Sequence, residues 1–131
     1  MLIMSATMSS MNRPIHFEIQ SADPKATCDF FKRVFNWKFN AWEGPQEYFL
    51  AMTGDDGPGI NGGIMRAPDR QARTVNVVDV DSIEDSVKRI EQAGGQIVVS
   101  KMAITGVGWA AYALDPTGVL FGIYKNDPSA K

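Results

Sequence analysis

Cysteine and histidine are scarce in this chain, since Cys28 and His16 are the only two among 131 residues. A single cysteine cannot form an intrachain disulfide, so the fold needs no oxidising compartment. Acidic residues outnumber basic ones by 15 to 13, which does not provide the basic surface that nucleic acid requires. No apolar run approaches the roughly 20 residues of a membrane span. These shortages exclude a disulfide scaffold and argue against nucleic-acid and membrane partners.

What is present is the composition of one globular domain. Hydrophobic residues make up 44% of the chain and charged residues 21%, which suffices for a real core. Residues 1–11 are rich in Met and Ser and lack the charged and apolar regions of a signal peptide, so we expect a disordered or loosely ordered extension and a cytoplasmic protein. The domain is expected over residues 12–126, followed by a frayed tail at 127–131.

The first half of this domain predicts one strand, one helix and three more strands. Residues 14–20 alternate between apolar and polar side chains, which is typical of a strand with one face of each kind. Asp23 and Pro24 start a helix, and apolar residues at helical spacing extend it to about Asn36. Further strands are expected at residues 37–42, 47–53 and 61–66.

The same order then repeats. A strand at 74–80 and a helix at 82–93 are followed by strands at 96–100, 109–114 and 119–125. Sliding the chain on itself by 59 residues places His16 on Val75 and Gly63 on Gly122. The sequence therefore predicts two βαβββ modules, residues 12–66 and 72–126, related by a pseudo-two-fold repeat.

Two such modules predict an α+β fold in which the helices lie outside a cupped mixed sheet that surrounds a cavity. The alternation in the first strand directs His16, Glu18 and Gln20 away from the helix. The remaining cavity positions are mostly apolar, as in small-molecule sites. The residues expected to line the site and bind a ligand are His16, Glu18, Gln20, Met65, Val75, Val77, Trp109, Tyr112, Gly122 and Tyr124.

Several of these residues also have simpler explanations. Trp109 and Tyr112 form an aromatic platform for a flat ligand in one interpretation and ordinary core packing in the other. Cys28, on the apolar face of the first helix, is expected to be a buried structural thiol. Lys101 either meets an anionic ligand or is an exposed lysine. The carboxylate of Glu18 is expected to favour the protonated form of His16.

Four stretches of the chain resemble a known family. They are similar to the corresponding stretches of glyoxalase-like domains. The four stretches are the opening Ile-His-Phe-Glu-Ile before Ala-Asp-Pro, the run Gln-Ala-Gly-Gly-Gln-Ile-Val-Val-Ser-Lys, the run Gly-Val-Gly-Trp-Ala-Ala-Tyr and the run Asp-Pro-Thr-Gly-Val-Leu-Phe-Gly-Ile. The resemblance covers roughly residues 12–126. It places the chain in the vicinal oxygen chelate superfamily, with glyoxalase I, extradiol dioxygenases and the bleomycin- and fosfomycin-resistance proteins.

The resemblance also implies a metal site that this sequence does not complete. Enzymes of the superfamily hold a divalent metal at four strand positions, which match His16, Gly63, Val75 and Gly122. His16 is the only one of the four with a ligating side chain, and no other histidine exists to replace the second. A divalent ion usually needs three or more protein ligands. We therefore expect no cofactor, and we disfavour a metal.

Four functions follow as hypotheses. The first is a bleomycin-resistance-like protein that binds a small organic ligand without a metal, as the family's usual homodimer. The second is a metal-free enzyme that uses His16 and Glu18 as an acid–base pair. The third is a metal-dependent lyase, isomerase or dioxygenase, and the fourth is an interaction module. The residues leave open whether any reaction is catalysed.

Overall fold

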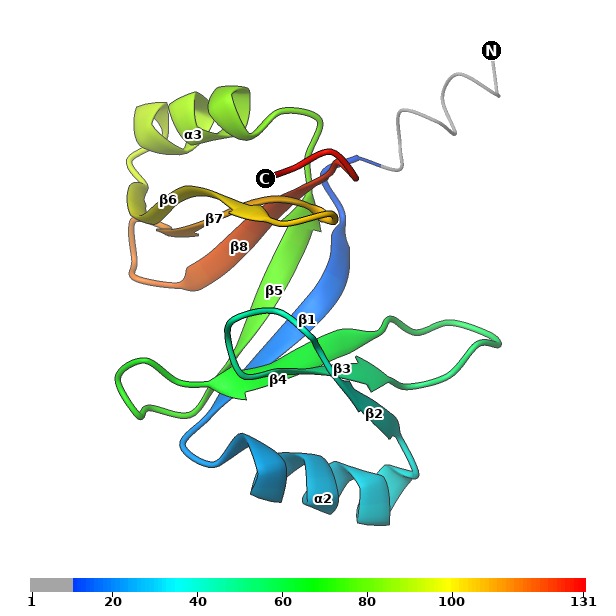
Figure 1. Cartoon of the computed structure of the whole chain (residues 1–131). Helices are drawn as coiled ribbons and strands as arrows, with labels where there is room; N and C mark the ends of the chain where they lie inside the picture. Colours follow the sequence, from blue (N-terminus) through cyan, green and yellow to red (C-terminus); the bar gives the residue numbers. More distant parts are fainter. Residues whose placement is uncertain (1–10) are drawn as a thin grey trace. The chain divides into compact units, whose positions relative to one another are not determined.

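The computed structural model describes residues 11–131, so the predicted N-terminal extension lies almost wholly outside the described residues. Two helices and eight strands follow one another in this part of the chain (Figure 1). They are β1 (Pro14–Ser21), α2 (Pro24–Phe35), β2 (Lys38–Ala41), β3 (Tyr48–Met52), β4 (Gly62–Arg66), β5 (Arg73–Asp79), α3 (Ile83–Gln92), β6 (Gln96–Ile104), β7 (Gly108–Leu114) and β8 (Leu120–Asn126). The α+β class and the order β-α-β-β-β in duplicate are both confirmed.

The starting points of the elements confirm the repeat. β1 and β5 begin at Pro14 and Arg73 (73 − 14 = 59), and α2 and α3 begin at Pro24 and Ile83 (83 − 24 = 59). The three remaining pairs of strands begin 58 or 60 residues apart. Because each pair of equivalent elements keeps nearly the same separation, the two halves are built to one plan.

The chain forms two compact units, of which residues 15–75 make one. We call this unit the first module. Its strands are ordered β2-β3-β4-β1, with β1 parallel to β4 and the other pairs antiparallel. Helix α2 lies along one face of β2, β3 and β4. The pairing is therefore mixed, and one face of this half-sheet carries the helix while the other does not.

Aromatic rings fill the space between α2 and the half-sheet. The ring of Trp37 stacks on that of Phe31 in α2 at 4.9 Å between centroids and also meets Phe17 of β1 at 5.7 Å. Phe17 lies against Gly62, where a Cβ would fall 2.6 Å from the Phe17 ring. The predicted apolar face of β1 thus packs toward the helix, and its polar face is turned to the other side.

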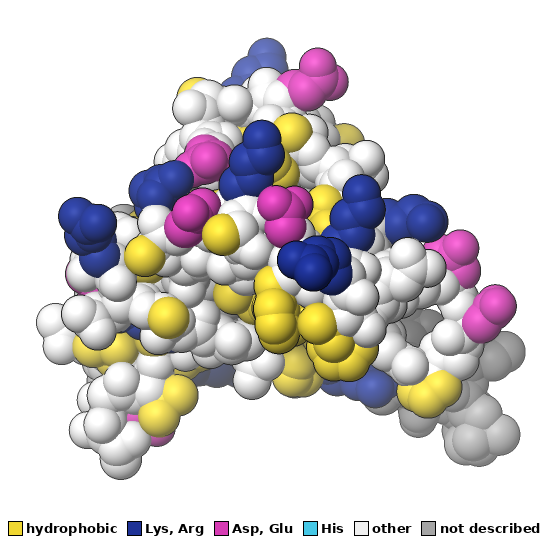
Figure 2. Space-filling model, turned by 90° about the horizontal axis from the view of Figure 1, so that it is seen from below, with side chains coloured by type: hydrophobic (Ala, Val, Ile, Leu, Met, Phe, Trp, Pro, Cys, Tyr) yellow, Lys and Arg dark blue, Asp and Glu magenta, His cyan; other side chains and the backbone are white. Residues whose placement is uncertain are grey.

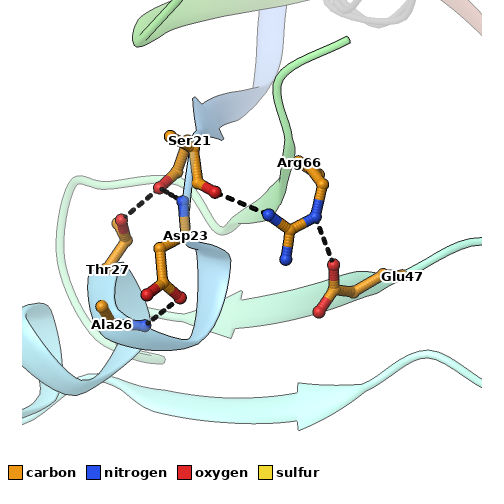
Figure 3. A network of polar contacts seen from close by, with 7 residues as sticks. Ser21, Asp23, Ala26, Thr27, Glu47 and Arg66 are labelled. Carbon is orange, nitrogen blue, oxygen red and sulfur yellow. Dashed lines mark hydrogen bonds and ion pairs between the residues drawn. The ribbon is translucent and has the colours of Figure 1, made fainter. Parts of the chain in front are cut away.

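The start of α2 is fixed by polar contacts (Figure 3). Asp23 is the N-cap, and its side chain accepts a hydrogen bond from the amide of Ala26 at 3.2 Å. Arg66 of β4 donates to the carbonyl of Ala22 at 2.6 Å and forms an ion pair with Glu47 at 3.1 Å. These contacts connect the helix start to β4 and to the residue before β3. They hold the ends of β1 and β4 in place.

The outer side of α2 exposes apolar side chains. Phe30, Val34 and Phe35 are 58%, 52% and 59% exposed. Figure 2, which views the molecule from the α2 side, shows hydrophobic side chains next to Lys and Arg. This surface is separated from the helix-free face by the thickness of the half-sheet.

Residues 76–131 form the body of the second unit, which we call the second module. Its strands are ordered β5-β8-β7-β6, with β5 parallel to β8 and the other pairs antiparallel. Helix α3 packs through Ile83, Val87 and Ile90 against the strands, where Ala111 and Ile123 are buried. Its N-cap is Ser82, which accepts from the amide of Asp85 at 3.1 Å.

The C-terminal residues differ from the expected frayed tail. The amide of Asp127 donates to the carbonyl of Val107, and the amide of Gly106 donates to the carbonyl of Ala130, each at 2.9 Å. Ala130 is only 1% exposed. The last residues are therefore hydrogen-bonded to the β6–β7 turn.

No helix among residues 11–131 is long and apolar enough to cross a membrane.

Candidate functional site: a polar cluster on the helix-free face of the first module

The polar side chains of β1 gather on the face of the first module that lacks the helix. His16, Glu18 and Gln20 alternate with the helix-facing residues, as the sequence predicts. Glu18 is 3% exposed and Gln20 5%. Carboxyl and amide groups are buried at such a level only when other groups hydrogen-bond to them. The surroundings of these side chains therefore define what the face can bind.

Tyr48, at the start of β3, connects two of these side chains. Its hydroxyl donates to Glu18 Oε2 at 3.3 Å and lies 2.8 Å from His16 Nε2. Because the one hydroxyl proton is directed at Glu18, His16 donates through Nε2–H, which is the neutral tautomer with a free Nδ1 lone pair. The three groups form a hydrogen-bonded series from imidazole through phenol to carboxylate.

Gly63 of β4 provides the space that Tyr48 occupies. A Cβ at this position would lie 2.0 Å from the Tyr48 hydroxyl oxygen and 2.2 Å from Cζ. Gly63 pairs with Glu18 on β1 and with Leu50 on β3, so it lies in the middle of the half-sheet. The space that glycine leaves at this position is therefore occupied by the phenol of Tyr48.

Apolar side chains surround the polar cluster on the same face. Leu50 and Met52 alternate with Tyr48 along β3 and are 38% and 39% exposed. Met65, which pairs with Tyr48 in the antiparallel register, is half-buried. An apolar surface with a few convergent polar groups is the usual composition of a small-molecule site.

His16 is less basic than a free histidine. Burial lowers its pKa below the ordinary value of 6.5, because a buried imidazolium loses its hydration. This direction is opposite to the one expected from a neighbouring carboxylate, and burial is its cause. The imidazole is neutral at pH 7 and acts as a hydrogen-bonding group and proton acceptor rather than a cation.

Gln20 is engaged at the edge of this face. Arg73 Nη1 donates to Gln20 Oε1 at 2.7 Å, and the same guanidinium binds the carboxylate of Asp69 through both of its terminal nitrogens. The Arg73 side chain lowers the pKa of Asp69 to about 2. Gln20 and Arg73 thus hold each other, and both are oriented before any ligand arrives.

The second module has a helix-free face of its own, to which the structure assigns most of the other predicted ligand residues. Val77, Gly122 and Tyr112 lie together there, since a Cβ at Gly122 would be 3.2 Å from the Tyr112 ring and 3.4 Å from Val77. Tyr124 follows on β8, and its hydroxyl donates to the carbonyl of Val107 at 3.1 Å. Its pKa is raised by burial and by the charge of Asp79.

Trp109 is the exception, because it lies on the opposite face of β7. It packs with the α3 core, and its indole Nε1 donates to Asp127 at 2.9 Å. Lys101 lies 4.4 Å above the Trp109 ring and forms an ion pair with Glu84 of α3. Trp109 therefore does not share a platform with Tyr112, and its surroundings match the alternative of core packing.

Val75, which was expected to bind a ligand, and Cys28, which was expected to be a structural thiol, are both buried. Val75 is 1% exposed in β5, and Cys28 is 6% exposed on the core side of α2. Burial, followed by the charge of Asp29, raises the pKa of the Cys28 thiol to about 11. A thiol of this kind is protonated at neutral pH and is a poor nucleophile.

The donor set of the polar cluster does not fit a divalent metal. No group of three or more His, Cys, Asp or Glu side chains within residues 11–131 is arranged to hold an ion. The position equivalent to a family ligand at Gly63 is filled by the Tyr48 phenol, and His16 Nε2 is already hydrogen-bonded to it. A metal would require the phenol to move away and two further ligands to be found.

Sequence reasoning missed Tyr48, Leu50 and Met52. The residues lie on a strand that was expected, but the pairing of β3 with β4, and of β4 with β1, brings Tyr48 beside His16 across 32 positions of sequence. The one available signal was the period of two, which puts the three residues on one face of β3.

Comparisons with known proteins agree with this architecture. The sequence profile of the Glyoxalase/Bleomycin resistance protein/Dioxygenase superfamily matches residues 13–123. The anthracycline biosynthesis proteins DnrV of Streptomyces peucetius and DauV of Streptomyces sp. (strain C5) are 23% and 25% identical over 128 and 131 residues. Each alignment covers 86% of this chain and 46% of the relative, so the chain spans about half the length of these relatives.

Solved structures show the same fold. One is a variant of Streptomyces coelicolor methylmalonyl-CoA epimerase in complex with 2-nitronate-propionyl-CoA, which matches with a TM-score of 0.67 at 11% identity. That match covers 92% of this chain and 99% of the epimerase. Since the profile spans both βαβββ modules, the chain belongs to the Glyoxalase/Bleomycin resistance protein/Dioxygenase superfamily.

Proposed function

We propose that this protein binds a small organic molecule on the helix-free face of the first module, without a divalent metal. The observation that carries the proposal is the cluster of His16, Tyr48 and Glu18. The phenol oxygen of Tyr48 lies 2.8 Å from the imidazole of His16 and 3.3 Å from the carboxylate of Glu18, and apolar side chains of β3 share this face. Such a cluster orients a ligand through hydrogen bonds, while Leu50 and Met52 supply apolar contact area.

The relatives suggest the chemical class of the ligand. DnrV and DauV are named for anthracycline biosynthesis, and anthracyclines contain flat fused rings with quinone and phenol oxygens. A flat ring system suits an apolar sheet face, and its oxygens suit the polar cluster. We therefore propose a fused-ring aromatic ligand that hydrogen-bonds with His16 or Glu18.

Titration of the chelator-treated protein with quinizarin, a neutral dihydroxyanthraquinone, tests this proposal. We expect saturable binding with a micromolar dissociation constant by calorimetry. Binding to His16→Ala should be about two- to tenfold weaker, because one neutral hydrogen bond is worth about 0.5–1.5 kcal/mol. Cys28→Ser, on the other side of the half-sheet, is the matched control and should bind as the wild type does. Equal binding by all three proteins would contradict the proposed site.

Metal-free acid–base catalysis is the second candidate. The hydrogen-bonded series His16–Tyr48–Glu18 favours it, because a proton taken up at one end is passed to the other by exchange of two hydrogen bonds. The neutral His16 keeps Nδ1 as a proton acceptor at pH 7. Deuterium incorporation from heavy water into an acidic C–H of a bound ligand, measured by NMR, would separate this activity from binding alone. Loss of exchange in Glu18→Gln with unchanged affinity would support it.

A homodimer is a further expectation of the family resemblance. Sedimentation equilibrium gives a direct measurement, since the chain has a mass of 14.4 kDa. A mass near twice this value at micromolar concentration is the expected result.

A further inference from the structure

We infer that Trp42 is a specificity-determining residue of this site, because its indole contacts the end of a fused-ring ligand that lies farthest from His16. This inference rests on the proposed function, and it specifies how many rings the ligand needs in order to occupy the whole site.

Trp42 lies beside Tyr48 on the helix-free face of the first module. It directly follows β2, and its amide donates to the carbonyl of Tyr48 at 2.8 Å, which extends the pairing of β2 with β3 by one residue. Side chains that lie opposite each other in an antiparallel pair share one face of the sheet. The two rings are 6.5 Å apart between centroids, and their planes differ by 79°. Trp42 is therefore an aromatic neighbour of the polar cluster.

The rings of His16, Tyr48 and Trp42 form a row across the half-sheet. The centroids of His16 and Tyr48 are also 6.5 Å apart, and their planes differ by 14°. The strand order β2-β3-β4-β1 places Trp42 and His16 at opposite ends of this row. Because three strand spacings amount to roughly 14 Å, a single six-membered ring cannot contact both ends. A ligand whose oxygens bond to His16 needs additional fused rings to reach Trp42.

Gly44 provides the position that the indole occupies. A Cβ at Gly44 would lie 1.9, 2.0 and 2.2 Å from Cη2, Cζ3 and Cζ2 of Trp42, which are three consecutive atoms of the six-membered ring. A point at nearly equal distance from three consecutive ring atoms lies over the ring and not beside its edge. The backbone of Gly44 therefore covers one face of the indole and orients it before a ligand arrives, which lowers the entropic cost of binding.

The other two tryptophans each belong to a core that faces a helix. Trp37 stacks on Phe31 of α2 at 4.9 Å between centroids. Trp109 packs with the α3 core and donates to Asp127. Trp42, by contrast, is half-buried on the face of the first module that carries no helix. A tryptophan at such a place offers a large and rigid apolar surface for recognition of a ligand.

Two probes that carry the same oxygens on different numbers of rings test the inference. Quinizarin has the two rings of naphthazarin, a dihydroxynaphthoquinone, and one additional fused benzene ring. Both probes therefore present the same hydroxyl and carbonyl groups to His16, and the additional ring of quinizarin should reach Trp42. In Trp42→Ala, calorimetry at pH 7 in chelator should show about two- to tenfold weaker binding of quinizarin, because an aromatic pair contributes about 0.5–1.5 kcal/mol. Binding of naphthazarin should be almost unchanged.

Phe30→Ala is the matched control for this variant. It removes an aromatic ring that is 58% exposed on the outer side of α2, which lies on the opposite side of the half-sheet. The affinities for both probes should stay as in the wild type. An equal loss of affinity for quinizarin and naphthazarin in Trp42→Ala, a loss for neither, or the same loss in Phe30→Ala would overturn the inference.

The indole N–H signals of the wild-type protein give a second readout by NMR, which does not depend on the folding of Trp42→Ala. The signal of Trp42 is assigned by its absence in Trp42→Phe. At saturation with quinizarin this signal should shift through the ring current of the additional ring, and it should shift less with naphthazarin. The signals of Trp37 and Trp109 should stay in place. A Trp42 signal that does not move at saturation would also overturn the inference.

The same titrations separate this inference from the proposed function. If quinizarin does not bind to the wild-type protein, the proposed aromatic ligand is wrong and the inference falls with it. If quinizarin binds more weakly to His16→Ala but equally well to Trp42→Ala, the proposed site stands and the role of Trp42 is wrong.

Discussion

Replacement of Tyr48 by phenylalanine tests whether its hydroxyl holds the polar cluster together. The change removes one oxygen and leaves the ring, so apolar packing is almost preserved. It deletes the hydrogen bond to His16 at 2.8 Å and the one to Glu18 at 3.3 Å. Glu18 is 3% exposed and cannot turn to water for a replacement. The loss of a partner by a buried acceptor costs about 1–3 kcal/mol.

This cost corresponds to a measurable change in the melting temperature. An unfolding entropy of about 2.1 cal/mol/K per residue gives about 275 cal/mol/K for a chain of 131 residues. A loss of about 1–3 kcal/mol therefore lowers Tm by about 4–11 °C. Differential scanning calorimetry at pH 7 measures this change directly.

Tyr124→Phe is the matched control, because it removes a hydroxyl from the second module. That hydroxyl contacts the carbonyl of Val107 and the amide oxygen of Asn126, and both partners also have access to solvent. We expect Tm to fall by less than half as much as in Tyr48→Phe. Equal melting temperatures for wild type and Tyr48→Phe would refute the description of the cluster.

Three further predictions concern the same module. Gly63→Ala places a Cβ 2.0 Å from the Tyr48 hydroxyl, so Tyr48 must leave its position. The free energy of unfolding should fall by about 1–3 kcal/mol, which denaturant unfolding would detect. An unchanged denaturation midpoint would contradict the close approach. His16, the only histidine of the chain, should titrate below pH 6.5 by NMR. Because its pKa is lower in the folded state than in the unfolded state, its contribution to stability is complete above pH 6.5 and is lost as the pH falls through the folded pKa. A measured pKa above 6.5 would contradict this direction. The pKa of Cys28 is raised from 9.0 to about 11, so the folded protein should carry about a hundredfold less thiolate at pH 8 than the protein unfolded in urea. Alkylation of the folded protein should be slower by at least that factor. Similar alkylation rates in the folded and unfolded states would show that the thiol is accessible.

The fold could be predicted almost completely because its signals are local or repeat along the chain. Alternation in β1, the capping residues Asp23 and Ser82 and the offset of 59 residues each required only neighbouring positions or a comparison of the chain with itself. Burial then follows from the alternation, as the contact of Phe17 with the α2 side confirms.

The site was predicted in part, because its contacts depend on strand pairing. His16 and Glu18 lie on one strand and could be placed together from alternation alone. Tyr48 could not be placed beside them, since nothing in the sequence states the register of β3 on β4. The grouping of Trp109 with Tyr112 overlooked their separation by three positions, which puts them on opposite faces of a regular strand.

The expected tail shows another limit of local reasoning. Asp-Pro-Ser at the end of a chain is typical of an irregular segment. Here, Asp127 accepts hydrogen bonds from the Trp109 indole and from the amide of Ser129. A short polar segment is thus ordered by a side chain 18 positions earlier in the sequence. Composition does not reveal such a contact.

The central claim is that the cluster of His16, Tyr48 and Glu18 binds an organic ligand without a metal. The most direct measurement is calorimetric titration of quinizarin into protein stripped of metal, with and without added Zn²⁺, Ni²⁺ or Mn²⁺, for wild type and His16→Ala. The account predicts equal affinity of the wild type with and without metal, and about two- to tenfold weaker binding by His16→Ala under both conditions. Binding that appears only after a metal is added, and that is abolished in His16→Ala, would contradict it.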